Sequence, residues 1–115
     1  MQKNIFGKKG EIIAQNYLKK KGYKILATNY KNKIGEIDII CKDKNYLVFV
    51  EVKTRTSSAF GDPLEAIDER KQYKIQQVAS LYLITTKQTN ASVRFDAIAV
   101  LGENDEEIRH IENAF

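Results

Sequence analysis

The sequence predicts a mixed α/β domain in which helices cover a β-sheet. Three observations predict this fold. Two stretches carry apolar residues at helical spacing, residues 36–53 alternate in the manner of a β-hairpin, and another alternating run follows the second helical stretch. The chain has 115 residues, of which 43% are hydrophobic. Because this length suits one core and is too short for two, we expect residues 1–115 to form a single domain.

The first half of the chain is expected to form a helix and three strands. A helix is predicted over residues 8–21, because lysines near its end suit the helix dipole and Gly22 is a good stop. A strand is expected around residues 23–30. Residues 36–41 and 46–53 then form a hairpin around the turn sequence "DKN". The apolar residues that recur along the helix are Ile12, Ile13, Ala14, Tyr17 and Leu18.

The second half of the chain is expected to return to the sheet after a helix. The sequence "SSAFGD" before the single proline, Pro63, is the strongest loop signal. Residues 65–86 follow as a mainly helical stretch, residues 92–101 as a strand, and residues 107–112 as a short edge strand. The predicted order is therefore helix–strand–strand–strand–helix–strand–strand.

The charges of the chain are unevenly distributed. The formal net charge is +4, but residues 1–60 hold 13 Lys and Arg against 5 Asp and Glu, whereas residues 61–115 hold 6 against 10. Such asymmetry favours a face that meets a polyanion. The alternative is that Lys19, Lys20 and Lys21 only solvate the end of a helix.

The composition also indicates a compartment. The one cysteine, Cys41, cannot form an internal disulfide, which fits a reducing environment. The first residues, "MQKNIFGKKGE", lack the apolar core of a signal peptide, and no apolar run approaches the length of a membrane span. We therefore expect a cytoplasmic protein with no membrane partner.

The hairpin carries charges that its apolar strands do not explain. Strand side chains alternate between faces, so Glu51 and Lys53 share a face with Leu47 and Phe49. In the first strand, alternation places Glu36, Asp38 and Ile40 on one face and Ile37, Ile39 and Cys41 on the other.

The register of the hairpin decides how close the two acids lie. If Lys44–Asn45 form the turn, Asp38 lies directly opposite Glu51. If the turn is Asp43–Lys44, Asp38 faces Phe49, and Glu51 is a diagonal neighbour about 7 Å away. Either register gathers two carboxylates and one ammonium at one end of an apolar face.

Two carboxylates opposite each other on a sheet repel. One of them could protonate, Lys53 could neutralise part of the charge, or a hard divalent cation such as Mg²⁺ could bind both. The single histidine and single cysteine lie away from this cluster, which argues against a zinc site. From the residues alone, an ordinary cross-strand ion-pair cluster and a metal site both remain open.

Several ordered blocks of the chain resemble a known family. They are "GKKGEIIAQNYLKKKGYKILATNY", "GEIDII", "FVEVKTR", "FGDPLEAI", "KQYKI" and "RFDAIAV". Together they resemble the YraN-like family of small bacterial proteins, which is similar to archaeal Holliday-junction resolvases and to the PD-(D/E)xK nuclease superfamily. The resemblance implies a restriction-endonuclease-like core, with a mixed sheet flanked by helices. It also implies a Mg²⁺- or Mn²⁺-dependent endonuclease that hydrolyses DNA, on branched or repair intermediates.

The resemblance also implies roles for individual residues. It makes Asp38, Glu51 and the main-chain carbonyl of Val52 the metal ligands, with Asp38, Glu51, Lys53 and the helix residue Glu11 as the catalytic set. The superfamily proline before the aspartate is absent, because residue 37 is Ile. Glu11 could equally be an acid near a helix start that the helix dipole favours.

Other residues are expected to contact nucleic acid or to form structural pairs. The basic residues expected to bind phosphate are Arg55, Lys8, Lys9 and Lys71, although Lys71 could also be only solvated. Asp96 is expected to pair with Arg94 or Arg55, and His110 is assigned no role. Cutting both strands of a junction would need two active sites, which a homodimer would supply. The alternative function is a non-catalytic nucleic-acid-binding module or a scaffold that keeps the nuclease fold.

Overall fold

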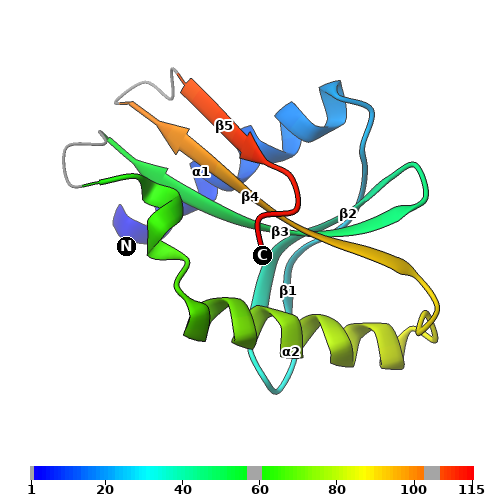
Figure 1. Ribbon diagram of the computed structural model, residues 1–115. Coiled ribbons are helices and arrows are strands. Elements are labelled where there is room, and N and C mark those ends of the chain that lie inside the picture. The colour runs from blue at the N-terminus through cyan, green and yellow to red at the C-terminus, as the bar shows by residue number, and fades with distance from the viewer. Residues whose placement is uncertain (1, 57–60, 103–106) are drawn as a thin grey trace.

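Five strands form one sheet with a helix on each face in the computed structural model (Figure 1). The structure describes residues 2–56, 61–102 and 107–115, with side chains from Lys9 onward. The elements are α1 (Gln2–Lys20), β1 (Lys24–Lys31), β2 (Glu36–Asp43), β3 (Tyr46–Arg55), the 3₁₀ helix η1 (Pro63–Ala66), α2 (Glu69–Thr85), β4 (Ser92–Leu101) and β5 (Glu107–Ile111). In the described part of the chain, no helix is both long and apolar enough to cross a membrane.

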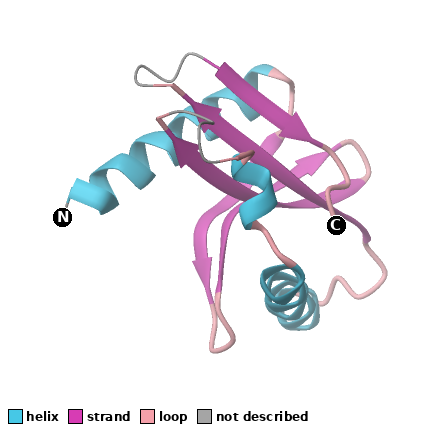
Figure 2. Cartoon of the chain, turned by 60° about the vertical axis from the view of Figure 1, so that its left-hand side comes forward, coloured by secondary structure: helices cyan, strands magenta, loops and turns pink. Residues whose placement is uncertain are grey.

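The strands lie in the order β1-β2-β3-β4-β5. All neighbours are antiparallel except β3 and β4, which run parallel because α2 carries the chain across one face between them. Figure 2 shows α1 on one face of the sheet and α2 on the other. The predicted mixed α/β fold and order of elements are confirmed.

Two element boundaries differ from the predicted ones. Helix α1 begins at Gln2 rather than at residue 8. The stretch predicted as one helix over residues 65–86 is divided into η1 and α2. Each piece has its own aspartate cap, because Asp62 accepts from the Leu64 N–H and Asp68 accepts from the Lys71 N–H.

The sheet has a core on each face. Between the sheet and α1 lie the buried residues Ala14, Leu18, Tyr23, Ile39, Cys41, Val48, Val50, Val52, Ile98 and Val100. Between the sheet and α2 lie Ile37, Ile40, Leu47, Phe49, Ile67, Ile75, Val78, Ala79 and Ala97. The alternation expected for β3 is therefore confirmed.

The hairpin has the first of the two registers considered. Lys44 and Asn45 form the turn, with Lys44 at φ 55°, and Ile39 lies opposite Val50. Continuing this register places Asp38 opposite Glu51, where β2 begins to leave β3.

The expected face of Ile37 is wrong. Strict alternation places it with Ile39 on the α1 side, but Ile37 packs in the core on the α2 side. The reason is that β2 stays paired with β1 as far as Glu36 opposite Lys31, while the β2–β3 pairing ends at Ile39. In Figure 1 this end of β1 and β2 bends toward α2, and Ile37 lies in the core on that side.

Candidate active site

The side chain of Asp38 lies where β2 separates from β3. Its Oδ2 atom accepts a hydrogen bond from the main-chain N–H of Val52 at 2.7 Å. The carboxylate thus takes the place of a strand carbonyl just beyond the pair Ile39–Val50. Because the N–H and C=O of one strand residue point to the same side, the Val52 carbonyl also faces this opening.

Glu51 is the second carboxylate at this opening. Its side chain is only 10% exposed. Burial, together with the charge of Asp38 and a hydrogen bond to it, raises the pKa of Glu51 to about 8. The negative charge of Asp38 and Glu51 is therefore incompletely balanced within the protein, and a bound cation would relieve it.

Two lysines stand beside these carboxylates. Lys71 of α2 places its Nζ atom 3.9 Å from Oε1 of Glu51. Burial, and then the neighbouring ammonium of Lys71, lowers the pKa of Lys53. Lys71, for which a solvated position was the alternative, faces the site, while Glu69, two residues before it, is exposed.

Glu11 reaches the same place from α1. Burial and the charge of Asp38 raise the pKa of Glu11, so it belongs to the same cluster, and we call Glu11, Asp38 and Glu51 the acidic cluster. The approach of α1 depends on Gly10, because a side chain there would overlap the hydroxyl of Thr54 on β3. A glycine inside a helical pattern, which costs about 1 kcal/mol relative to alanine, is the sequence signal that could have identified Gly10.

Asn29 is a neighbour of this cluster that the sequence did not reveal. Its φ of 50° is left-handed although it lies within β1. The pairs on either side of it, Thr28–Ile39 and Tyr30–Ile37, place Asn29 opposite Asp38, and its side chain hydrogen-bonds Glu11. Since asparagine is depleted in strands, its presence in "TNY" was the available signal.

The carboxylates open into a cleft of about 350 Å³. The cleft lies between the β1–β2 turn, β3 and the first half of α2. Its lining combines acids and bases: Lys31, Gly35, Glu36, Asp38, Glu51, Lys71, Lys74 and Ile75. The buried Glu51 and the partly buried Asp38 suit a metal ion, and the exposed Lys31 and Lys74 suit a phosphate.

The donor set fits a hard cation better than a soft one. Within the described ranges, no group of three or more His, Cys, Asp and Glu side chains is arranged to hold a metal ion. The set available at the cleft is instead two carboxylates, of Asp38 and Glu51, and the main-chain carbonyl of Val52. All are oxygen ligands, which Mg²⁺ and Mn²⁺ accept together with several waters.

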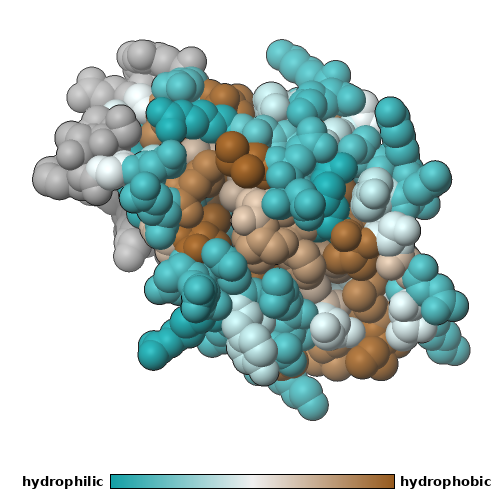
Figure 3. Space-filling view, in the orientation of Figure 1, coloured by the Kyte–Doolittle hydropathy of each residue, from teal (hydrophilic) through white to brown (hydrophobic). Residues whose placement is uncertain are grey.

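A second hollow is apolar. Figure 3 shows hydrophobic surface gathered between η1, α2 and the C-terminal segment. A groove of about 120 Å³ lies there, lined by Leu64, Ile67, Gln72, Ala97, Ile111, Ala114 and Phe115. Its lining contains no charged side chain, so it does not suit a phosphate, and the acidic cleft is the better candidate for chemistry.

The other predicted nucleic-acid contacts lie near the end of β3 and on α1. Arg55 is exposed two residues beyond Lys53, and its Nη1 atom donates to the Thr54 carbonyl. Lys9 is exposed on α1. The side chain of Lys8 lies outside the described residues. Their contact with nucleic acid stays a prediction.

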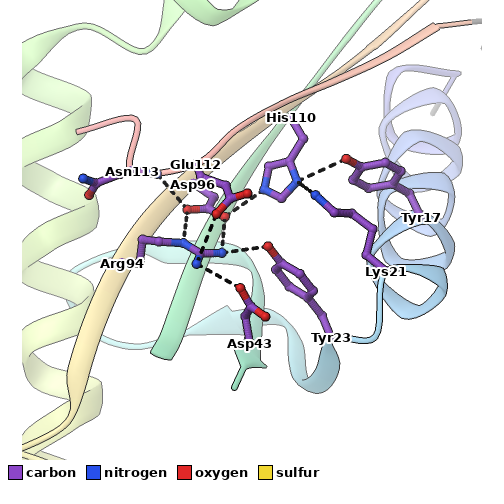
Figure 4. A network of polar contacts seen from close by, with 9 residues as sticks. All are labelled: Tyr17, Lys21, Tyr23, Asp43, Arg94, Asp96, His110, Glu112 and Asn113. Atoms are coloured by element: carbon purple, nitrogen blue, oxygen red, sulfur yellow. Dashed lines mark hydrogen bonds and ion pairs between the residues drawn. The ribbon is translucent and has the colours of Figure 1, made fainter. Parts of the chain in front are cut away.

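A buried polar network lies on the α1 side at the other end of the sheet (Figure 4). Asp96, fully buried, accepts hydrogen bonds from Arg94 and from the Asn113 N–H, and its Oδ2 atom lies 2.8 Å from Nε2 of His110. The predicted Arg94–Asp96 pair is confirmed. Burial alone would raise the pKa of Asp96, but the bonds from His110, Arg94 and Asn113 outweigh it and lower that pKa.

His110, which was assigned no role, joins β5 to α1 in this network. Its Nδ1 atom lies 3.2 Å from the Tyr17 hydroxyl and 3.2 Å from Nζ of Lys21. An ammonium can only donate, so Nδ1 accepts and Nε2 carries the proton that it donates to Asp96. The role of His110 is therefore structural, and it depends on contacts between residues far apart in the sequence.

Comparisons with known proteins identify relatives over nearly the whole chain. A family model described as "Uncharacterised protein family UPF0102" matches residues 10–100, a range that contains the whole acidic cluster. The chain is 50% identical over 119 residues to a UPF0102 protein of Caldanaerobacter subterraneus subsp. tengcongensis, covering 100% of this chain and 98% of that protein. It is 50% identical over 109 residues to one of Thermodesulfovibrio yellowstonii (95% and 94% covered). A third, of Alkaliphilus oremlandii, is 48% identical over 118 residues, with both chains fully covered.

Proposed function

The chain belongs to the uncharacterised protein family UPF0102, which confirms the resemblance to the YraN-like family, and we propose that it is a divalent-metal-dependent endonuclease that hydrolyses phosphodiester bonds in DNA. The observation that carries this proposal is the convergence of Asp38 and Glu51 on one cleft. Asp38 is held there by the Val52 N–H, and burial beside Asp38 raises the pKa of Glu51 to about 8. The negative charge of two such neighbouring carboxylates is only partly neutralised when no cation is bound.

The ligands of the cation would be Asp38, Glu51 and the Val52 carbonyl. A divalent ion held by these residues would supply Lewis-acid stabilisation of the negative charge that builds on a phosphate during its hydrolysis. The protein itself supplies the placement of these oxygens. Asp38 is fixed by its hydrogen bond to β3, and Glu51 is fixed by burial between β3 and α2.

The lysines supply positive charge on the substrate side of the carboxylates. Lys53 shares a strand face with Glu51, and its ammonium lies close enough to Lys71 and the two carboxylates to interact with them, so it would meet a phosphate bound at the metal. Burial lowers the pKa of Lys53. A lysine with a lowered pKa is better able to exchange a proton with the attacking water. Lys71, 3.9 Å from Glu51, stabilises the same negative charge from α2. Glu11, on the opposite side of Asp38, is suited to hold a water molecule as an outer-shell acceptor.

A second candidate function is a nucleic-acid-binding module without turnover. The basic first half of the chain and the lysine rim of the cleft would favour such a module equally. What favours the enzyme is Lys53. A binding module has no need for a half-buried lysine with a lowered pKa beside two carboxylates.

Cleavage assays with a lysine variant separate the two functions. Supercoiled, linear and four-way-junction DNA would be incubated with the parent protein and with Lys53→Ala, in Mg²⁺, Mn²⁺ or EDTA. The parent should cleave at least one DNA with metal and none in EDTA. Lys53→Ala should cleave about 100-fold or more slowly, because the ammonium acts mainly in the transition state, while DNA affinity changes by less than about threefold.

Lys42→Ala is the matched control, because Lys42 is exposed on β2 and lies toward the other end of the strand from Asp38. It should cleave at the parent rate. If the parent cleaves none of the three substrates at high enzyme excess, the binding module becomes the better proposal. If Lys53→Ala cleaves as fast as the parent, the activity belongs to another site or another protein.

A further inference from the structure

Two lysines on the rim of the cleft have no role in the chemistry described above. Lys31 is the last residue of β1, and Lys74 lies one helical turn after Lys71 on α2. Both line the cleft with Asp38 and Glu51. Within the described residues, neither Lys31 nor Lys74 forms an ion pair, whereas Lys71 lies 3.9 Å from Glu51. Glu36 lies opposite Lys31 in the β1–β2 ladder and also lines the cleft, but in the described part of the chain no ion pair joins it to either lysine.

The stem of Lys74 passes close to the β1–β2 turn, although the residue as a whole is exposed. A Cβ atom at Gly35 would lie 3.2 Å from Cε of Lys74 and 3.2 Å from Cγ2 of Val78. The β1–β2 turn therefore approaches α2 closely enough for Gly35 to cover the methylene groups of Lys74. Contact with Gly35 restricts the stem of Lys74 while its ammonium stays at the mouth of the cleft. The side chain therefore loses less conformational entropy when a ligand binds.

The turn that follows Lys31 is fastened to the same helix. The side-chain amide of Asn32 donates to the carbonyl of Val78 at 3.2 Å, and its oxygen accepts from the N–H of Ile34 at 3.0 Å. The end of β1 and the middle of α2 are thus held together by a side chain that bridges them. The end of β1 that carries Lys31 and the part of α2 that carries Lys74 are consequently held together at the cleft.

We propose that Lys31 and Lys74 together bind one backbone phosphate of DNA, the one next to the phosphate at the acidic cluster. Helix geometry places Lys74 about 4.5 Å further along α2 than Lys71, which already lies beside Glu51. A DNA strand then leaves the cleft between α2 and the β1–β2 turn. The claim that this phosphate is adjacent to the cleaved one rests on the proposed function, because that function defines which phosphate is cleaved. Binding of a phosphate by Lys31 and Lys74 can be measured without any cleavage.

The test measures binding without cleavage. Fluorescence anisotropy in EDTA, over a series of salt concentrations, would follow fluorescein-labelled duplex DNA with the parent, Lys31→Ala, Lys74→Ala and the double variant. Each single variant should bind about 5- to 10-fold more weakly at low salt. For duplex DNA the logarithmic salt slope falls by about 0.9 for each phosphate that the protein no longer neutralises. Because the two lysines share one phosphate, the slope of the double variant should fall by about 0.9 rather than by about 1.8.

Gly35→Ala tests the packing that positions Lys74. The added methyl group crowds the stem of Lys74 by a few tenths of an ångström while leaving every charge in place, so this variant should lose part of the affinity that Lys74→Ala loses. Its melting temperature and circular dichroism would establish that it is folded. Lys42→Ala, which changes an exposed lysine outside the cleft, should bind like the parent.

Each outcome has one meaning. Unchanged affinity in Lys31→Ala and Lys74→Ala, or no binding of DNA by the parent, overturns the inference. A fall of about 1.8 in the salt slope of the double variant would contradict the claim that the two lysines share one phosphate. Weaker binding in both single variants, with a fall of about 0.9 in the double variant, supports it even if the parent cleaves no DNA, in which case only the proposed activity fails. An RNA duplex of the same sequence, bound tighter than DNA, would overturn the assignment to DNA.

Discussion

The carboxylate of Asp38 accepts a hydrogen bond from the main-chain N–H of Val52 at 2.7 Å and thereby takes the place of a carbonyl in the β2–β3 ladder. The same side chain faces Glu51 and Glu11, whose pKa values it helps to raise. The Asp38 carboxylate therefore has two roles, one in the pairing of β2 with β3 and one in the candidate active site. Asparagine at position 38 keeps an oxygen acceptor for the Val52 N–H and removes the charge, so Asp38→Asn separates the two roles.

The stability of the metal-free protein should fall as the pH rises from about 5 to 8. Glu51 has a pKa of about 8 when folded, against an ordinary value of 4.5. Between these values the folded state holds more protons than the unfolded state, so raising the pH favours unfolding. Urea denaturation in EDTA at pH 5, 6, 7 and 8 would measure this slope in the parent and in Glu51→Gln.

The glutamine variant should be much less sensitive to pH over the same interval. The difference between parent and Glu51→Gln should change by on the order of 3 kcal/mol between pH 5 and pH 8. Glu11, whose pKa is also raised, contributes with the same sign in both proteins and cancels in the comparison. Parallel stability curves for the two proteins would show that Glu51 titrates in its ordinary range.

Asn29 should tolerate glycine better than alanine. Its φ of 50° is left-handed, a conformation that costs a residue with a Cβ about 1–2 kcal/mol and costs glycine little. Asn29→Ala should therefore destabilise the protein by about 1 kcal/mol, and Asn29→Gly by less, in urea denaturation. Both variants remove the side chain that hydrogen-bonds Glu11.

The two variants should nevertheless share a functional defect. If the Asn29 amide positions Glu11, both should lower the rate of metal-dependent DNA cleavage to a similar degree, although their stabilities differ. Asn29→Asp adds a charge beside the acidic cluster and should lower the rate further. A cleavage rate that follows stability rather than the presence of the amide would make Asn29 purely structural.

The buried network around Asp96 should be a major source of stability. Asp96→Asn removes the buried carboxylate that Arg94 and His110 share, and breaking a buried pair typically costs about 3–5 kcal/mol. Asp43→Asn removes a different partner of Arg94, one whose side chain is 23% exposed, and should cost about 1 kcal/mol or less. Chemical denaturation of both variants would measure these costs. Equal, small losses would contradict the structural role given to Asp96.

The sequence predicted that Asp38 and Glu51 lie next to each other. A two-residue turn and alternating side chains leave few registers for a hairpin, so the meeting of Asp38 and Glu51 followed from local pattern. The face of Lys53 followed for the same reason. The face of Ile37 could not be predicted in this way, because the alternation of side chains fails where β2 separates from β3 and stays paired with β1.

The surroundings of the site depend on tertiary packing, which the pattern does not specify. Gly10 matters only because α1 presses against Thr54, and Lys74 only because α2 lies against Gly35. The sequence left open whether Lys71 faces Glu51 or solvent, because the rotation of α2 over the sheet is set by its core contacts. His110 acquired its role from partners on β4 and α1.

Calorimetric titration of Mn²⁺ into the metal-free protein at pH 7 tests the central claim, that Asp38 and Glu51 form a divalent-metal site. Asp38→Asn is the test variant. Glu65→Gln is the control, because Glu65 is an exposed acid on η1 that does not line the cleft. At pH 7 a carboxyl with a pKa of about 8 is about nine-tenths protonated. Binding to the parent should therefore release about 0.9 proton, measured from the dependence of the heat on buffer ionisation enthalpy.

We expect saturable Mn²⁺ binding with this proton release in the parent and in Glu65→Gln, and loss of both in Asp38→Asn. Saturable binding that persists unchanged in Asp38→Asn, or no binding to the parent at millimolar Mn²⁺, would contradict the metal site.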